Sequence, residues 1–135
     1  MNTQDNLEKI RQHYLAFQSG DIPGALAIMA EQVDFLSPVT HNPTKEITWA
    51  KPRFSRREVA AFFKKLGEKM AVEKMEIFSF TAQDKRVVVE GRNAGTVRET
   101  GKRYVHDWVT IFTFEQDKVI KCRHYYDTAD LLAAF

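Results

Sequence analysis

The chain has 135 residues, a formal net charge of +2, 44% hydrophobic residues and 28% charged residues. These values are typical of a one-domain globular protein and exclude a disordered or fibrous chain. The single Cys122 excludes an internal disulfide, and neither a signal-peptide pattern nor an apolar run of membrane-spanning length is present. We therefore expect one domain over residues 1–135, located in the cytoplasm and without contact with a membrane.

The N-terminal segment shows helical periodicity. Leu7, Ile10, Tyr14 and Phe17 recur at intervals of three and four residues. This spacing places the four side chains on one face of a helix that ends before Gly20.

A short helix, a short strand and a long loop come next. Asp21 has the side chain of a helix N-cap, and residues 33–37 have the composition of a strand. Residues 39–54 contain prolines and scattered charges, which predicts a loop. We expect this loop to be a lid or binding segment in which His41 and Trp49 cover the pocket. The alternative is that both residues pack against the following helix.

A third helix begins with the clearest signal in the chain. Ser55 and Glu58 have the spacing of a capping box, and Val59, Phe62 and Phe63 begin an apolar stripe. From residue 72 to residue 127 the pattern alternates, with turn signals between strands. This order predicts an α+β fold in which a curved, mostly antiparallel sheet wraps around the helices to form a cone with an internal pocket.

Turn lengths predict which residues pair across the strands. Two-residue turns at residues 84–85 and 100–101 give these opposite pairs: Phe80 with Val89, Phe78 with Gly91, Gly95 with His106, and Asn93 with Trp108. In the last hairpin, a two-residue loop would place Lys121 and Arg123 unpaired on the inner face, which is costly. We therefore expect a three-residue loop, which pairs Phe112 with Cys122, Thr110 with His124, and Trp108 with Tyr126.

These pairings divide the sheet into an inner and an outer face. The outer face carries Val105, Val109, Ile111 and Tyr125 beside Asp107 and is too apolar to be simply solvated, so we expect a homodimer through it. Asp107 belongs to this face, where we expect an ion pair with the diagonal Arg92 and no catalytic dyad with His106.

Motifs along the whole chain resemble one family. Tyr14 in the first helix, "SGD" after it, "VDFLSP", and "DWVTIFTFEQDKVIKCRHYYDTADL" resemble the SnoaL-like and ketosteroid-isomerase-like proteins of the nuclear transport factor two superfamily. The resemblance implies a cone-shaped α+β fold. It leaves the reaction open, because that superfamily includes isomerases, cyclases, hydratases, dehydratases and binding proteins.

The resemblance also indicates one reaction to exclude. Ser37 occupies the position of the isomerase's general-base Asp, and Thr110 that of its protonated Asp. Tyr14 matches its oxyanion-binding Tyr, and Phe63 replaces a second Tyr. Because a serine hydroxyl cannot act as a base near neutral pH, we expect no steroid isomerisation.

Three residues are candidates for catalysis. His106 and His124 would act as acid or base, and Tyr14 would donate a hydrogen bond to a developing oxyanion. The alternative is that each histidine is a buried ring held by a neighbour. The expected ligand-contacting residues are Ser37, Trp49, Phe63, Asn93, Trp108, Thr110, Phe112, Cys122 and Tyr126. We expect no metal, because the histidines lie too far apart to share one and no third ligand is evident.

The sequence therefore predicts a protein that needs no cofactor and binds an apolar small molecule. As an enzyme it would be an isomerase, cyclase or dehydratase that transfers protons on a carbonyl or hydroxyl compound. Alternatively it would be a non-catalytic binding module that uses the same pocket. A third function, binding of anions or nucleic acid through the basic residues at 51–57, is disfavoured because the cluster is short.

Overall fold

The computed structural model describes residues 2–37, 42 and 44–135. The elements in chain order are α1 (Thr3–Gln18), α2 (Ile22–Leu26), β1 (Met29–Leu36), β2 (Arg53–Ser55), α3 (Arg56–Lys69), β3 (Met70–Gln83), β4 (Arg86–Val97), β5 (Arg103–Glu115), β6 (Lys118–Tyr126) and α4 (Thr128–Leu132). No helix within these described ranges is long and apolar enough to cross a membrane.

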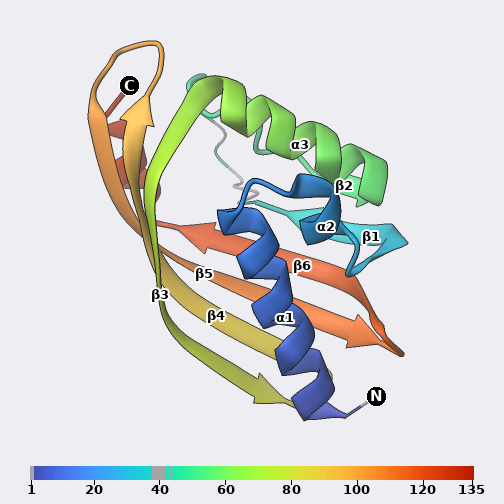
Figure 1. Ribbon diagram of the computed structural model, residues 1–135. Helices are drawn as coiled ribbons and strands as arrows, with labels where there is room; N and C mark the ends of the chain where they lie inside the picture. Colours follow the sequence, from blue (N-terminus) through green and yellow to red (C-terminus); the bar gives the residue numbers. More distant parts are fainter. Residues whose placement is uncertain (1, 38–41, 43) are drawn as a thin grey trace.

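All six strands form one open sheet in the order β2-β1-β6-β5-β4-β3. Strands β1 and β6 run parallel, and the other neighbours run antiparallel. The long strands β3, β4 and β5 bend around α1 and α3, which lie on the concave side (Figure 1). The expected α+β fold, with N-terminal helices against a curved and mostly antiparallel sheet, is confirmed.

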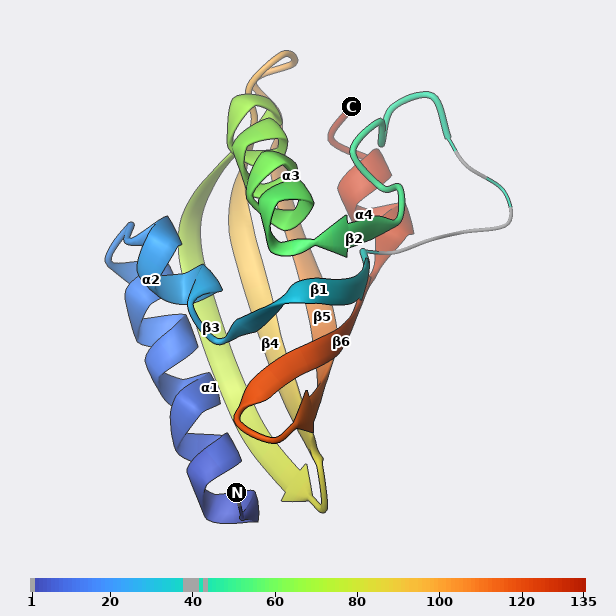
Figure 2. The same ribbon diagram turned by 90° about the vertical axis from the view of Figure 1, so that its right-hand side faces the viewer.

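Side-chain caps fix where the helices begin. The Asn2 side chain accepts a hydrogen bond from the Asp5 amide at the start of α1 (2.9 Å). At the start of α3, the Ser55 hydroxyl accepts one from the Glu58 amide (3.1 Å), as the capping-box spacing predicts. Helix α1 then packs against β3 and β4, and α3 packs against β1, β2 and β3. Helix α4 packs against β5. Figure 2 looks onto the concave side of the sheet, with α1 and α3 in front of the long strands.

The predicted register of the last hairpin is confirmed, but its turn is different. Trp108 lies opposite Tyr126, Thr110 opposite His124, and Phe112 opposite Cys122. The loop has two residues, and the register then shifts by one beyond Thr113, where a β-bulge begins. The bulge keeps Arg123 off the inner face, where it would lack a partner; its guanidinium instead binds the Asp34 carboxylate (2.8 Å).

The predicted register between β4 and β5 is wrong by two residues. Asn93 lies opposite His106, and Gly91 opposite Trp108. The cause is a wider turn, in which the Val97 amide donates to the Lys102 carbonyl (2.9 Å) and Gly101 has a φ of +71°. Because a shift of two preserves the alternation of side chains, each residue keeps its predicted face. Asp107 therefore lies directly opposite Arg92, and their ion pair is confirmed at 2.6 Å.

Phe78 was predicted on the inner face and lies on the outer face. The register of β3 against β4 shifts between Ile77 and Ser79, so Ile77 pairs with Gly91 in its place. The Phe78 ring is 52% exposed and packs against the guanidinium of Arg92 at 5.3 Å. A bulge of this kind turns every side chain before it to the other face, and the sequence shows no signal for it.

Candidate functional site

The concave side of the sheet encloses a cavity of about 120 Å³ beneath α1 and α3. All twelve residues that we selected from the sequence line it: Tyr14, Ser37, Trp49, Phe63, Asn93, His106, Trp108, Thr110, Phe112, Cys122, His124 and Tyr126. They come from α1, α3, β4, β5, β6, the residue directly after β1 and the segment before β2. Residues far apart in the sequence are therefore brought together around one volume.

The cavity wall has no formal charge. Among the described residues that line it, none is Asp, Glu, Lys or Arg. Most of the others are aromatic or aliphatic, including Met29, Phe35 and Phe62, which we had not selected. An ion bound here would lose its hydration without gaining a charged partner, so the wall favours a neutral, apolar guest.

Tyr14, Thr110 and His124 form the first polar group in the wall, which we call the Thr110 cluster. The Thr110 hydroxyl and His124 Nδ1 are 2.6 Å apart, a hydrogen-bond distance whose direction depends on the tautomer of the ring. The Tyr14 hydroxyl interacts with Thr110, which offsets part of the large rise that burial causes in the pKa of Tyr14. After their mutual hydrogen bond, a hydroxyl and a neutral imidazole still have a donor and acceptors available.

Burial keeps the imidazoles of the cavity neutral. Together with a smaller effect of nearby His106, it lowers the pKa of His124 to about 3. The pKa of His106 falls to about 4 for the same reason, although Asp127 and Asp107 partly oppose the shift. At neutral pH neither ring is charged, so neither is poised as an acid in the empty cavity.

His13 is a cavity residue that our sequence reasoning missed. Its Nδ1 donates to the Ala25 carbonyl (2.7 Å), and burial lowers its pKa to about 4 against the opposing effect of that bond. It lies between Ile10 and Tyr14 on the buried face of α1. The helical spacing from Ile10 should have revealed it, because a residue three positions further lies on the same face.

Trp108 lines the cavity, and contacts with Asn93 and Tyr14 fix the position of its ring. Its Nε1 donates to Asn93 Oδ1 (2.9 Å), and its ring stacks on that of Tyr14 at 5.7 Å. The ring also lies across Gly91, where a Cβ atom would collide with it. The glycine therefore makes room for the indole, as a strand glycine often does where another group approaches closely.

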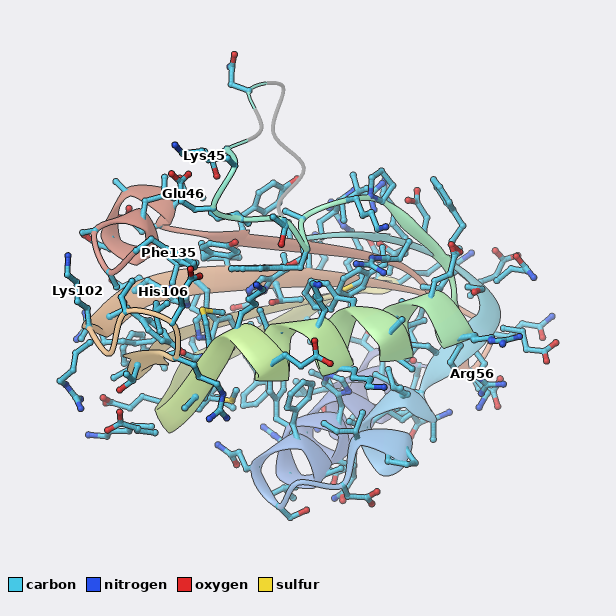
Figure 3. The ribbon with its side chains drawn as sticks, turned by 90° about the horizontal axis from the view of Figure 1, so that it is seen from above. Lys45, Glu46, Arg56, Lys102, His106 and Phe135 are labelled. Carbon is cyan, nitrogen blue, oxygen red and sulfur yellow. The ribbon has the colours of Figure 1, made fainter. Side chains whose placement is uncertain are left out.

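Trp49, His106 and Tyr126 form a second polar group, which we call the Trp49 cluster. The His106 ring stacks on that of Tyr126 (5.0 Å between centroids). Burial raises the pKa of Tyr126, and the side chain of Trp49 beside its hydroxyl offsets a small part of that rise. The cluster lies close to Phe135 in space, since the rings of Trp49 and Phe135 are 6.0 Å apart between centroids. In Figure 3, His106 and Phe135 lie at the end of the molecule opposite Arg56.

Four further features were considered in the sequence: the thiol of Cys122, the expected lid, the basic segment 51–57 and a metal site. Burial raises the pKa of Cys122 to about 12, so its thiol is unreactive at neutral pH. Trp49, expected on a lid, is only 1% exposed, while His41 lies outside the described residues. In the 51–57 segment Arg53 is buried and donates to the Trp49 carbonyl (3.2 Å), so the basic residues are not displayed together. Within the described ranges, no group of three acidic, His or Cys side chains could hold a metal ion.

Comparison with known proteins identifies relatives of this chain. The family model of the SnoaL-like domain matches residues 10–122. A search of curated proteins finds no match.

Solved structures share the fold over nearly the whole chain. An NTF2-like protein from Burkholderia xenovorans is 29% identical, with 99% of this chain and 98% of that chain covered and a TM-score of 0.81. TerC, crystallised with polyporic acid, is 21% identical, with 96% and 97% covered and a TM-score of 0.83. A protein of Xanthomonas campestris pathovar campestris that is designated a polyketide cyclase is 19% identical, with 99% and 98% covered and a TM-score of 0.75.

Proposed function

The chain belongs to the family of SnoaL-like domains, and from this premise we propose that its cavity binds a neutral, apolar small molecule without a cofactor. The observation that carries the proposal is the wall of the cavity, in which no described side chain is charged. The TerC structure supports one part of the proposal by analogy, the binding of a small organic molecule in this fold, because TerC was crystallised with polyporic acid.

The size and the chemistry of the wall define the class of ligand. At about 10–15 Å³ for each water-sized group, the volume of 120 Å³ accommodates on the order of ten non-hydrogen atoms. Tyr14, Trp108 and Phe112 line this space, and the ring of Tyr14 packs on the other two rings. A compact aromatic or polycyclic molecule complements such a wall better than a flexible chain does, because it loses less conformational entropy on binding.

Intrinsic fluorescence tests the proposal directly. Both tryptophans of the chain, Trp49 and Trp108, line the cavity, so a ligand that enters it must change their emission. We expect 2-naphthol to bind and 2-naphthalenesulfonate to bind at least about tenfold more weakly, since the anion loses its hydration. A Tyr125→Ala variant changes only the outer face and should bind 2-naphthol as the wild type does. Binding of neither probe, or tighter binding of the anion, contradicts the proposal.

Proton transfer is the second candidate, favoured by the 2.6 Å contact between Thr110 and His124. A ring nitrogen of His124 would take the α-proton of a bound ketone, breaking the C–H bond and leaving an enolate; because burial lowers the pKa of this ring, the negative charge of the enolate beside it would have to stabilise the imidazolium. The Tyr14 hydroxyl would donate to the enolate oxygen. The proton would then return to carbon from the ring, or exchange with solvent first.

Hydrogen–deuterium exchange measures this step without knowledge of the natural substrate. In D₂O the protein should accelerate exchange of the α-protons of 2-tetralone, and the Tyr14→Phe variant should slow this about 10²-fold. A His124→Gln variant should return the rate to that of buffer. If the wild type gives only the buffer rate, the chain acts as a binding module; if His124→Gln keeps the wild-type rate, another group is the base.

The outer face of the sheet is where we propose that a second copy binds. Phe78, Val105 and Tyr125 are each about half exposed on this face. A face of this composition is common in homodimer interfaces. Light scattering should give the mass of a dimer, and Tyr125→Lys should shift it toward the monomer. A wild-type monomer at tens of micromolar concentration contradicts this proposal.

A further inference from the structure

We propose that the Trp49 cluster is a second hydrogen-bonding subsite, so that the ligand is a neutral aromatic molecule with an oxygen at each of two opposite ends. The inference rests on the proposed binding function and adds the chemical class of the ligand. One oxygen would bind at the Thr110 cluster and the other at the Trp49 cluster.

Buried polar atoms without partners point to this subsite. Trp49 Nε1, His106 Nδ1 and the Tyr126 hydroxyl are each buried and have no partner in good hydrogen-bond geometry among the described residues, although the Trp49 side chain lies close enough to the Tyr126 hydroxyl to lower its pKa slightly. Trp49 is 1% exposed and His106 is 5% exposed, and all three residues line the cavity. Buried polar atoms in native proteins are nearly always satisfied, and leaving one unsatisfied is costly. Three such atoms side by side indicate a missing partner.

The hydrogen-bonding capacity of the three groups defines that partner. The indole of Trp49 can only donate, so the partner atom must accept. The Tyr126 hydroxyl can donate to the same atom, and neutral His106 can donate or accept. A carbonyl or hydroxyl oxygen satisfies this set. A carboxylate would accept as well, but no described cation lines the cavity to stabilise its charge.

The position of the two clusters requires a ligand with two ends. Thr110 and His106 face the cavity from the same strand, four residues apart, so their backbone positions are roughly 13 Å from each other. The side chains come closer, since the rings of His124 and Tyr126, one from each cluster, are 5.5 Å apart between centroids, so one fused-ring molecule can reach both clusters. Trp108 lies between them, with its Nε1 occupied by Asn93. The space between the clusters is therefore walled by a ring without a free donor, which suits the apolar middle of a molecule with polar ends.

Two probes that differ by one hydroxyl test this arrangement. We would measure binding of 2-naphthol and of 2,6-dihydroxynaphthalene by calorimetry. The diol should bind about tenfold more tightly, because one additional buried hydrogen bond contributes on the order of one factor of ten. The Tyr126→Phe variant keeps the ring and removes the hydroxyl. In this variant the diol should lose most of its advantage, while 2-naphthol, which can turn its hydroxyl toward Thr110, should change by less than about twofold.

Matched variants separate this subsite from general effects on the fold. Tyr125→Phe removes a hydroxyl from the neighbouring residue on the outer face and should leave both affinities unchanged. Thr110→Val removes the opposite hydroxyl and should weaken the diol about as much as Tyr126→Phe does. In each variant, near-UV circular dichroism would establish that the aromatic packing is retained.

The outcomes distinguish this inference from the proposed function. If 2-naphthol binds but the diol binds no more tightly, the cluster holds only a water molecule and the inference is overturned. If Tyr126→Phe weakens both probes equally, Tyr126 has a structural role and the inference is again overturned. If neither probe binds the wild type, the proposed binding function fails and the inference fails with it.

Discussion

Three buried histidines should make the protein unstable in mild acid. The pKa of His13 and of His106 is lowered to about 4, and that of His124 to about 3, mainly by burial. In the unfolded chain each ring has a pKa near 6.5. Above that pH both states hold the neutral ring and the stability is fully present. Below it the unfolded chain takes up protons that the folded chain excludes, so stability falls until the pH reaches the folded pKa.

The size of the effect follows from the unfolded pKa alone. At pH 5.5 an unfolded ring is about nine-tenths protonated, which favours the unfolded state by about 1.4 kcal/mol, or about 4 kcal/mol for three rings. Proteins of this size are stable by about 5–15 kcal/mol, so the loss is a large part of the total. Glu73 and Asp107 have a lowered pKa through their arginine and threonine partners, and their contribution is lost only below about pH 4.

Urea denaturation followed by tryptophan fluorescence at pH 7.5, 6.5 and 5.5 measures this loss. At pH 5.5, unfolding should be accompanied by uptake of about two and a half protons. His124→Gln should reduce that uptake by about one, and Asp107→Asn should leave the curve in this range unchanged. A free energy of unfolding that stays constant within about 0.5 kcal/mol from pH 7.5 to 5.5 would refute the reasoning, because each ring would then be protonated equally in both states.

Three further predictions concern packing, a surface ion pair and the excluded reaction. Gly91→Ala should destabilise the protein by about 1–3 kcal/mol, because the new Cβ collides with Trp108 and lies 2.6 Å from the Glu76 carbonyl oxygen. Gly67→Ala, which meets nothing within 4 Å, should instead stabilise it by about 1 kcal/mol through helix propensity; thermal melts compare the two. Replacing both Arg92 and Asp107 by alanine should leave the midpoint of urea unfolding nearly unchanged, since both side chains are exposed. A 3-oxo-Δ5-steroid should show no isomerisation by absorbance, since no described carboxylate lines the cavity.

The register of the last hairpin could be predicted from the sequence because the wrong register would bury two unpaired charges, which costs free energy. Only one alignment keeps Lys121 and Arg123 off the aromatic inner face, and the structure adopts it. The turn before β5 carries no such constraint. Its residues 98–102 are all polar or glycine, so turn length cannot be inferred from burial. The predicted faces of β4 and β5 are correct only because the error in the register was an even number of residues.

Other features depend on contacts that a local pattern does not contain. The bulge at Phe78 is defined only by the pairing of β3 with β4, and it places the Phe78 ring against Arg92. The strand at 33–37 was expected, but its parallel partner β6 was not, because the two segments are remote in sequence. For Trp49 the sequence left two alternatives open, a place on a lid and packing against the following helix. Its contact with Phe135, which is remote in sequence, could not be inferred from the residues around it.

The parallel pairing of β1 with β6 has a consequence for biosynthesis. Asp34 binds Arg123 across 89 residues of sequence, whereas β3, β4 and β5 pair only with strands that neighbour them in the chain. A ribosome releases β1 first, and β1 cannot pair with β6 until β6 has emerged. During that interval Val33 and Phe35, both buried in the final fold, lack this strand beside them. The nascent chain is therefore most exposed to aggregation and to chaperones before β6 emerges.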